Sequence, residues 1–186
     1  MKATHSIILT SIFLLSCGAN GVMGQEGEDP AKTQDKVETG INRGQQAPEL
    51  VFESPAGEKI SLSSLRGQMV LIDFWAAWCG PCRRENPNLV KLYRKYKDKE
   101  FVNGSGFTIY SVSLDQNKEA WVAAIEKDSL EWGSHVSDLK GRQSAPAVEY
   151  EVTSIPANTL IDGDGIILAV GLRSYYLEDK LKELLQ

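Results

Sequence analysis

The chain has 186 residues, of which 42% are hydrophobic, so it is long enough for one domain with a substantial core and an additional tail. Its net charge of −5 argues against nucleic acid as a principal partner, because phosphate binding requires a basic surface. The three cysteines are too few for a disulfide-stapled mini-protein, and the two histidines are too few for a multi-histidine metal site.

Residues 1–16 have the pattern of an export signal. Lys2 supplies a positive charge, and residues 7–15 are almost entirely apolar. Nine helical residues rise about 14 Å, less than half of the hydrocarbon core of a bilayer, so the stretch fits a signal peptide rather than a membrane span. It ends in Leu-Leu-Ser-Cys, which resembles a bacterial lipobox, and we expect cleavage before Cys17 and lipid attachment to that cysteine. The alternative is an ordinary signal peptide with Cys17 near the cut.

Residues 17–40 are expected to form a flexible tether. They are rich in glycine and charge and hold almost no large apolar side chain, so they cannot bury enough surface to offset the entropy of ordering. A coil of this length spans roughly 25 Å on average, enough to hold a domain clear of a membrane surface. The folded domain is expected over residues 41–186.

The remaining elements predict an α/β domain with a mixed central sheet flanked by helices. Residues 50–53 and 58–62, on either side of a turn at 54–57, predict an N-terminal β-hairpin. Residues 69–75 and 107–114 are near-continuous apolar runs, which are typical of central strands covered on both faces. Helices are expected at 82–99, at 117–128, in a short segment ending at 147–150 and at 175–185, and a second hairpin at 159–162 and 166–170.

Residues 78–82, Trp-Cys-Gly-Pro-Cys, lie between an expected strand and an expected helix. Unpaired N–H groups and the dipole at a helix N-terminus favour an anion, which lowers the pKa of a thiol placed there and raises its reactive thiolate fraction. Cys79 has this position, and the two intervening residues bring Cys82 within reach of a disulfide. Pro81 removes an N–H group that would be unpaired and stiffens the loop. The pattern therefore predicts a redox-active cysteine pair.

Two other roles for the pair are less well supported. Half of a zinc site would need a second pair of ligands, and the remaining candidates are Cys17, expected to be lipidated, and His135 alone. A purely structural disulfide would close a loop of four residues, which constrains the unfolded chain very little. The expected chemistry uses the two sulfurs and needs no metal or cofactor.

Residues 73–82, Asp-Phe-Trp-Ala-Ala-Trp-Cys-Gly-Pro-Cys, are similar to the active-site segment of thioredoxins. The continuation Arg-Arg-Glu-Asn-Pro at 83–87 resembles the TlpA/ResA branch of secreted, membrane-tethered thioredoxin-like proteins. The resemblance covers about residues 44–186 and implies a thioredoxin fold with an N-terminal β-hairpin extension. Further matching segments are 44–50, 61–62, Gly67, and Ser-Ile-Pro at 154–156 before the strand at 159–162.

The resemblance implies a role for each residue of the central motif. Cys79 would attack a substrate disulfide, Cys82 would then attack Cys79 and release the reduced substrate, and the pair would end as a Cys79–Cys82 disulfide. Asp73 matches the buried thioredoxin aspartate that handles the proton of the second cysteine. Burial in a central strand also raises the pKa of a carboxyl group, which suits this task. The alternative for Asp73 is a strand-end aspartate that reaches water.

Substrate contacts are expected from both sides of the motif. Pro156 matches the cis-proline of the family, and Ile155 before it would offer backbone groups to an extended substrate chain. Trp78, Gly80 and Pro81 are expected to contact the substrate beside them.

Three other features are expected to have no special role. Glu85 lies one helical turn beyond Cys82, where it is able to tune the cysteine, but an ordinary solvated helix charge is the expected reading. His135 is expected to be a surface or loop residue. The glycine and serine content of residues 103–106 predicts a mobile loop.

The favoured function is a membrane-tethered thiol–disulfide oxidoreductase outside the cytoplasm. The resemblance implies reduction of disulfide-containing protein substrates, with electrons supplied by a membrane thiol donor, and leaves the oligomeric state open. One alternative is a thiol peroxidase on a related scaffold, although such peroxidases usually have a threonine at the position of Ala76. A remote alternative is a binding module whose cysteines only regulate docking.

Overall fold

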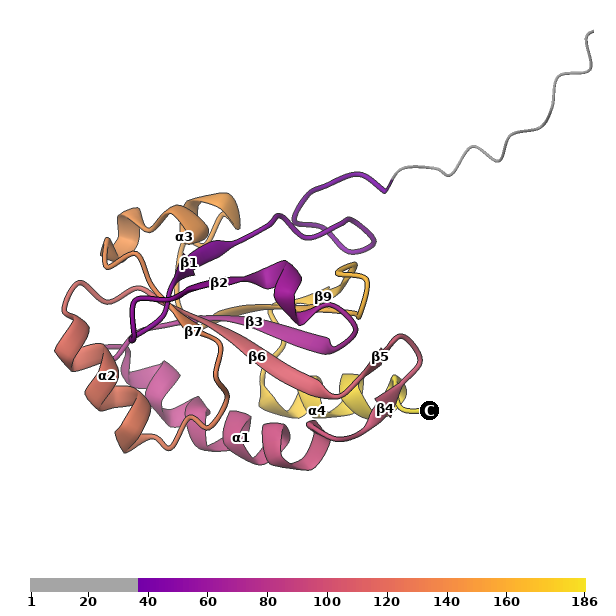
Figure 1. The fold of residues 1–186 in the computed structure, drawn as a ribbon. Coiled ribbons are helices and arrows are strands. Elements are labelled where there is room, and N and C mark those ends of the chain that lie inside the picture. The colour runs from indigo at the N-terminus through magenta and orange to yellow at the C-terminus, as the bar shows by residue number, and fades with distance from the viewer. Residues whose placement is uncertain (1–36) are drawn as a thin grey trace, which may run out of the picture. The chain divides into compact units, whose positions relative to one another are not determined.

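The computed structural model describes residues 37–186, which are built around a five-stranded mixed sheet (Figure 1). The strand order is β7-β6-β3-β8-β9. The pairs β3–β6 and β6–β7 are parallel, whereas β3–β8 and β8–β9 are antiparallel. The strand bounds are β3 Met69–Trp75, β6 Phe107–Ser113, β7 His135–Val136, β8 Ala157–Ile161 and β9 Ile167–Val170.

The two central strands, β3 and β6, are buried along their whole length because both faces of the sheet are covered. On one face, Leu89, Trp121 and Leu181 pack into a single apolar cluster. They belong to α1 (Gly80–Tyr96), α2 (Lys118–Lys127) and α4 (Ser174–Glu183). This cluster also contains both cysteines of the motif, so the helical face of the sheet positions the candidate site.

The opposite face of the sheet is covered by an N-terminal hairpin and a short helix (Figure 1). Leu50, Leu62 and Tyr150 pack there against the sheet residue Tyr110. The hydroxyl group of Tyr110 donates to the carbonyl of Ile60 at 2.9 Å, which fastens the hairpin to the sheet. The elements are β1 Val51–Glu53, β2 Lys59–Ser61, the 3₁₀ turns η1 Leu62–Leu65 and η2 Gly141–Gln143, and α3 Ala145–Glu149.

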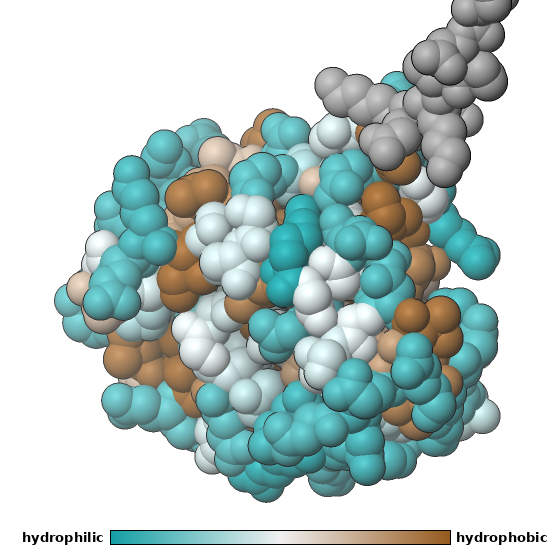
Figure 2. Space-filling view, turned by 45° about the vertical axis from the view of Figure 1, so that its right-hand side comes forward, coloured by the Kyte–Doolittle hydropathy of each residue, from teal (hydrophilic) through white to brown (hydrophobic). Residues whose placement is uncertain are grey.

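The expected mixed sheet, its flanking helices and the N-terminal hairpin are all present. Hydrophobic residues on the face shown in Figure 2 form small patches separated by hydrophilic ones. The expected signal segment and Cys17 lie outside the described residues. Gly40 donates to the carbonyl of Gln46 at 3.0 Å, so pairing to the domain begins just before residue 41. Within residues 37–186, no helix has both the length and the apolar character that crossing a bilayer requires.

The expectation for His135 is wrong. His135 is 5% exposed and lies in the edge strand β7. This strand is too short to produce a recognisable sequence pattern. Its ring stacks on Trp132, with 5.5 Å between the ring centroids. Burial lowers the pKa of His135 to about 4, so the ring is neutral at physiological pH.

The mobile loop expected at 103–106 is also wrong. The segment forms a small hairpin, β4 Glu100–Phe101 paired with β5 Gly104–Ser105. Gly106 has a φ of 88°, and a Cβ atom there would lie 2.7 Å from the carbonyl oxygen of Lys97. Glycine is therefore required for a close backbone approach, which composition alone does not distinguish from flexibility.

Candidate active site

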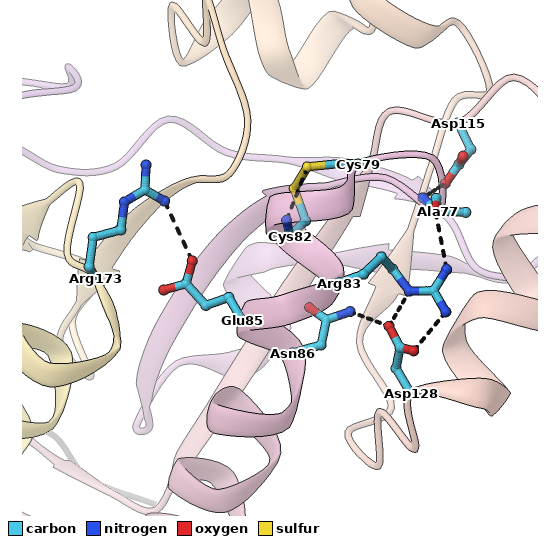
Figure 3. The surroundings of a disulfide bond; sticks show 9 residues. All are labelled: Ala77, Cys79, Cys82, Arg83, Glu85, Asn86, Asp115, Asp128 and Arg173. Atoms are coloured by element: carbon cyan, nitrogen blue, oxygen red, sulfur yellow. Dashed lines mark hydrogen bonds and ion pairs between the residues drawn. A yellow bond between two sulfur atoms is a disulfide. The ribbon is translucent and has the colours of Figure 1, made fainter.

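The two cysteines lie at the N-terminus of α1, joined by a disulfide with 2.04 Å between the sulfur atoms (Figure 3). Cys79 is the N-cap residue of the helix, and its sulfur accepts a hydrogen bond from the backbone N–H of Cys82 at 3.2 Å. Pro81 lies in the first turn, where its missing N–H group costs nothing. Once the disulfide is reduced, this arrangement offers an N–H donor and the helix dipole to a thiolate on Cys79.

A cavity of about 400 Å³ opens beside the disulfide and reaches only one of its two sulfur-bearing residues. Both cysteines are buried, at 4% exposed for Cys79 and 1% for Cys82, but only Cys79 lines this cavity. A disulfide brought into the cavity therefore meets Cys79 first. Other residues of the lining are Trp78, Gly80, Pro81, Leu114, Arg142 and Ile155.

The residues expected to bind substrate are placed in two groups. Trp78, Gly80, Pro81 and Ile155 line the cavity together. Pro156 lies directly before β8 and is not part of the lining, although the Ile155–Pro156 peptide bond is cis, as the resemblance implies.

Asp73 lies on β3 and is 4% exposed. Because side chains alternate along a strand, Asp73 points to the same face as Leu71 and Trp75, which share an apolar cluster with both cysteines. The pKa of Asp73 is raised to about 7, chiefly by burial and in part by the nearby charge of Glu85, while Arg173 opposes the rise. A carboxyl group of this pKa is able to give or take a proton at neutral pH.

Glu85 is not the freely solvated helix charge expected from the sequence. Its side chain is 13% exposed, and its carboxylate lies 3.5 Å from the guanidinium of Arg173. Arg173 follows β9 in the chain, so the sequence does not indicate that it meets α1. Figure 3 shows this pair on one side of the disulfide. It brings a second acid and a cation into the electrostatic environment of Asp73.

A second network holds the loop before Cys79 from the other side of the disulfide (Figure 3). The backbone N–H of Ala77 donates to Asp115 at 2.9 Å, and its carbonyl accepts from Arg83 at 3.1 Å. Arg83 also forms an ion pair with Asp128, to which Asn86 donates at 2.7 Å. Both backbone groups of Ala77 are thus fixed by side chains from separate elements, which limits the movement of the loop before Cys79.

The ion pair of this network is expected to contribute measurably to stability. Burial alone would raise the pKa of Asp128, but hydrogen bonds from Arg83 and Asn86 outweigh it and hold the pKa below its ordinary value. Asp128→Asn is therefore expected to lower the free energy of unfolding at pH 7 by about 1–3 kcal/mol. Urea denaturation measures this change.

The matched control for Asp128 is Glu131, whose partner is Arg94. Both side chains of that ion pair are exposed, at 40% and 57% respectively, so Glu131→Gln is expected to leave stability nearly unchanged. Equal losses in Asp128→Asn and Glu131→Gln would contradict the structural role of Asp128.

The sequence analysis missed Asp115, Arg83, Asp128, Arg142 and Arg173 as site residues. One signal was present for Asp115, which follows the expected strand at 107–114. The carboxyl ends of adjacent parallel strands lie at one edge of a sheet, so Asp115 and the motif after β3 had to meet. The other four depend on loop paths that no periodicity encodes. Among residues 37–186, no group of three His, Cys, Asp or Glu side chains is arranged to hold a metal ion.

Known proteins are similar to this chain in both sequence and fold. The model of the AhpC/TSA family matches residues 43–170. "Thioredoxin-like protein YneN" of Bacillus subtilis is 35% identical over 78% of this chain and 81% of the relative. "Thiol-disulfide oxidoreductase ResA" of Bacillus cereus is 30% identical over 90% of this chain and 88% of its own length.

Solved structures confirm the thioredoxin-like fold expected from the sequence. A thiol-disulfide oxidoreductase from Bacteroides fragilis is 37% identical, with a TM-score of 0.68 over 76% of this chain and 100% of that chain. The C-terminal domain of a putative thiol-disulfide oxidoreductase from Bacteroides thetaiotaomicron is 34% identical, with a TM-score of 0.69 over 77% of this chain and 96% of that chain. The chain therefore belongs to the AhpC/TSA family, in which it is a ResA-like thiol–disulfide oxidoreductase with a thioredoxin-like fold.

Proposed function

We propose that the protein is a membrane-tethered reductase of disulfides in extracytoplasmic proteins and that it acts through a Cys79/Cys82 dithiol. The observation that carries the proposal is the asymmetry of the pair. Cys79 caps α1 and lines the cavity, whereas Cys82 is shielded from it. Because of this asymmetry, Cys79 attacks the substrate in the first step and Cys82 attacks Cys79 in the second.

In the first step, the Cys79 thiolate attacks one sulfur of a substrate disulfide. A bond forms between Cys79 and that sulfur, the substrate S–S bond breaks, and the other substrate sulfur leaves as a thiolate that takes a proton. The N–H group of Cys82, 3.2 Å from the Cys79 sulfur in the oxidised protein, supports the attacking anion.

In the second step, Cys82 gives its proton to the Asp73 carboxylate and attacks the Cys79 sulfur. The mixed disulfide breaks, the second substrate sulfur leaves as a thiolate that takes a proton, and the Cys79–Cys82 disulfide forms. Asp73 returns the proton of Cys82 to the leaving thiolate or to solvent, so the carboxylate is restored. The substrate has gained two electrons and two protons in total, and the protein has lost two electrons. A thiol donor at the membrane would restore the dithiol by the reverse exchange. The second attack is fast because both sulfurs belong to one helical turn.

The dithiol mechanism is tested by trapping. Cys82→Ser, expressed in cells in the full chain, is expected to accumulate mixed disulfides with exported proteins, because the second attack is lost. The control is the double variant Cys79→Ser, Cys82→Ser, which has no attacking sulfur. Adducts that appear equally in both variants, or in neither, would contradict the proposed order of attack.

The location is tested separately, through the expected lipidation of Cys17. The full chain is expected in the membrane fraction. Protease added to intact spheroplasts or protoplasts is expected to digest the domain. Cys17→Ala is expected to release the domain from the membrane without changing its disulfide reduction. Recovery of the unaltered chain in the cytoplasmic fraction would overturn the proposed location.

The thiol peroxidase alternative has no supporting contact at the site. Ala76, where a threonine hydroxyl would serve peroxide, is fully buried and offers only a methyl group. The purified protein is therefore expected to consume hydrogen peroxide no faster than a free thiol. Sustained consumption above that rate would favour the peroxidase.

A further inference from the structure

A second hollow of about 420 Å³ shares Trp78, Leu114 and Arg142 with the lining of the cavity beside Cys79. Trp78 and Arg142 line both hollows, and Trp78 is 57% exposed. Lys140 lines the second hollow only. We call this surface, defined by Trp78, Lys140 and Arg142, the basic groove. It leads from the disulfide to the turn η2 and is large enough for several residues of an extended chain.

The basic groove contains two cationic side chains that form no ion pair within the described part of the chain. Neither Arg142 nor the side-chain amine of Lys140 has a hydrogen bond or ion pair with residues 37–186. The nearby acid Asp138 accepts from the backbone N–H groups of Lys140 and Ala145, at 3.1 and 2.8 Å. Arg142 lines the cavity that Cys79 also lines, and Lys140 lines the adjoining hollow, in a protein of net charge −5.

We infer that the basic groove selects substrates with an Asp or Glu side chain close to the disulfide cysteine, and that Arg142 binds this carboxylate. This inference rests on the proposed reductase function and names its substrate class. A guanidinium group donates two parallel hydrogen bonds to the two oxygens of a carboxylate, and the exposed Trp78 ring provides an apolar surface for the flanking chain. An acidic segment complements the groove, and a basic segment is repelled from it.

Another cation lies near the motif and must be separated from Arg142. A Cβ atom on Gly80 would lie 3.5 Å from the guanidinium of Arg84, which extends from α1. Arg84 does not line either hollow, whereas Arg142 lines both. The selectivity is therefore assigned to Arg142.

The experiment compares three disulfide-bonded peptides that differ at one position beside the cysteine, with Glu, Gln or Lys. The rate of single-turnover reduction by the reduced full-length protein is measured for each peptide, and the rates for two peptides are divided. Because a general loss of activity in a variant lowers both rates equally, it does not change this ratio. The unaltered protein is expected to prefer Glu over Gln by about fivefold, the size of a solvent-exposed ion pair. The preference should shrink when salt is raised to screen the charges.

Arg142→Gln is expected to bring the Glu-to-Gln ratio close to one, and Arg142→Glu to favour the Lys peptide. Arg84→Gln and the distant exposed Arg43→Gln are expected to keep the original ratio. Equal rates for all peptides with the unaltered protein, or a ratio that Arg84→Gln abolishes and Arg142→Gln retains, would overturn the inference. Failure of the unaltered protein to reduce any peptide, or the uncharged bis(2-hydroxyethyl) disulfide, would instead overturn the proposed reductase function.

Discussion

Cys79→Ser is expected to lower the rate of disulfide reduction by about 10³-fold or more. A serine hydroxyl is not ionised at neutral pH, and the N–H donor and helix dipole at the N-cap cannot make it a useful nucleophile toward sulfur. Because Cys82 is 1% exposed and does not line the cavity, it cannot replace Cys79 in the first attack. Reduction of insulin in the presence of dithiothreitol measures the loss.

Cys82→Ser is the matched variant, with the same atom exchanged at the other end of the disulfide. It is expected to form the mixed disulfide in a first turnover at nearly the original rate and then to stop. The two variants therefore differ in the burst of released substrate thiol, not only in steady turnover. A burst in Cys79→Ser, or none in Cys82→Ser, would show that the attacking sulfur has been assigned wrongly.

Asp73→Asn is expected to slow the second step by about 10²-fold, the lower range of general acid–base catalysis. Asp73 must be ionised to take the proton of Cys82, and burial raises its pKa to about 7. The rate at which the mixed disulfide resolves should therefore rise with pH through neutrality in the unaltered protein. This inflection should be absent in Asp73→Asn. Rapid-mixing measurements across pH 5–9 would show it, and an unchanged profile would contradict the proton role of Asp73.

Asp73→Asn is expected to slow the reaction but to raise the stability of the fold. Between the ordinary pKa of 3.8 and about 7, the unfolded chain releases the proton that folded Asp73 retains. The oxidised protein therefore loses stability as pH rises through this window, and the loss stays constant above it. Asp73→Asn removes this cost and should raise the free energy of unfolding above pH 7 by up to about 4 kcal/mol.

Asp128→Asn provides the control of opposite sign, because its carboxylate is held below its ordinary pKa by Arg83 and Asn86. Neutralising the buried Asp73 is expected to stabilise the fold, and neutralising the partly buried Asp128 is expected to destabilise it. Urea denaturation of both variants at pH 4 and pH 8 compares them. Destabilisation by Asp73→Asn at pH 8 would contradict this prediction, because it would mean that interactions in the folded protein offset the cost of burying the charged carboxylate.

The parts of the fold that were predictable are those whose local pattern and tertiary role agree. The apolar runs at β3 and β6 are buried on both faces, and the stripe on α1 packs as its spacing indicates. The edge strand β7 was missed because two residues carry no periodicity, and His135 was misplaced with it. The β4–β5 hairpin was missed because glycine looks the same in a mobile loop and in a close backbone approach.

The active site divides in the same way. The cysteines were proposed from the strand-to-helix turn on which they lie. The role of Asp73 was proposed from the resemblance to thioredoxins and from its place in a central strand. Glu85 was undervalued because its partner, Arg173, comes from 88 positions along the chain. Arg142 lies in a turn without regular spacing, so its place beside the cavity depends on the tertiary fold alone.

Alkylation of the reduced protein measures most directly whether the two sulfurs differ as the site geometry requires. With limiting iodoacetamide at pH 7 and mass spectrometry of the peptides, Cys79 is expected to be labelled first and many times faster than Cys82. Its labelling rate should also exceed that of a free cysteine in a short peptide. Labelling of Cys82 first, or of both sulfurs at the rate of the free peptide, would contradict the assignment of Cys79 as the attacking sulfur.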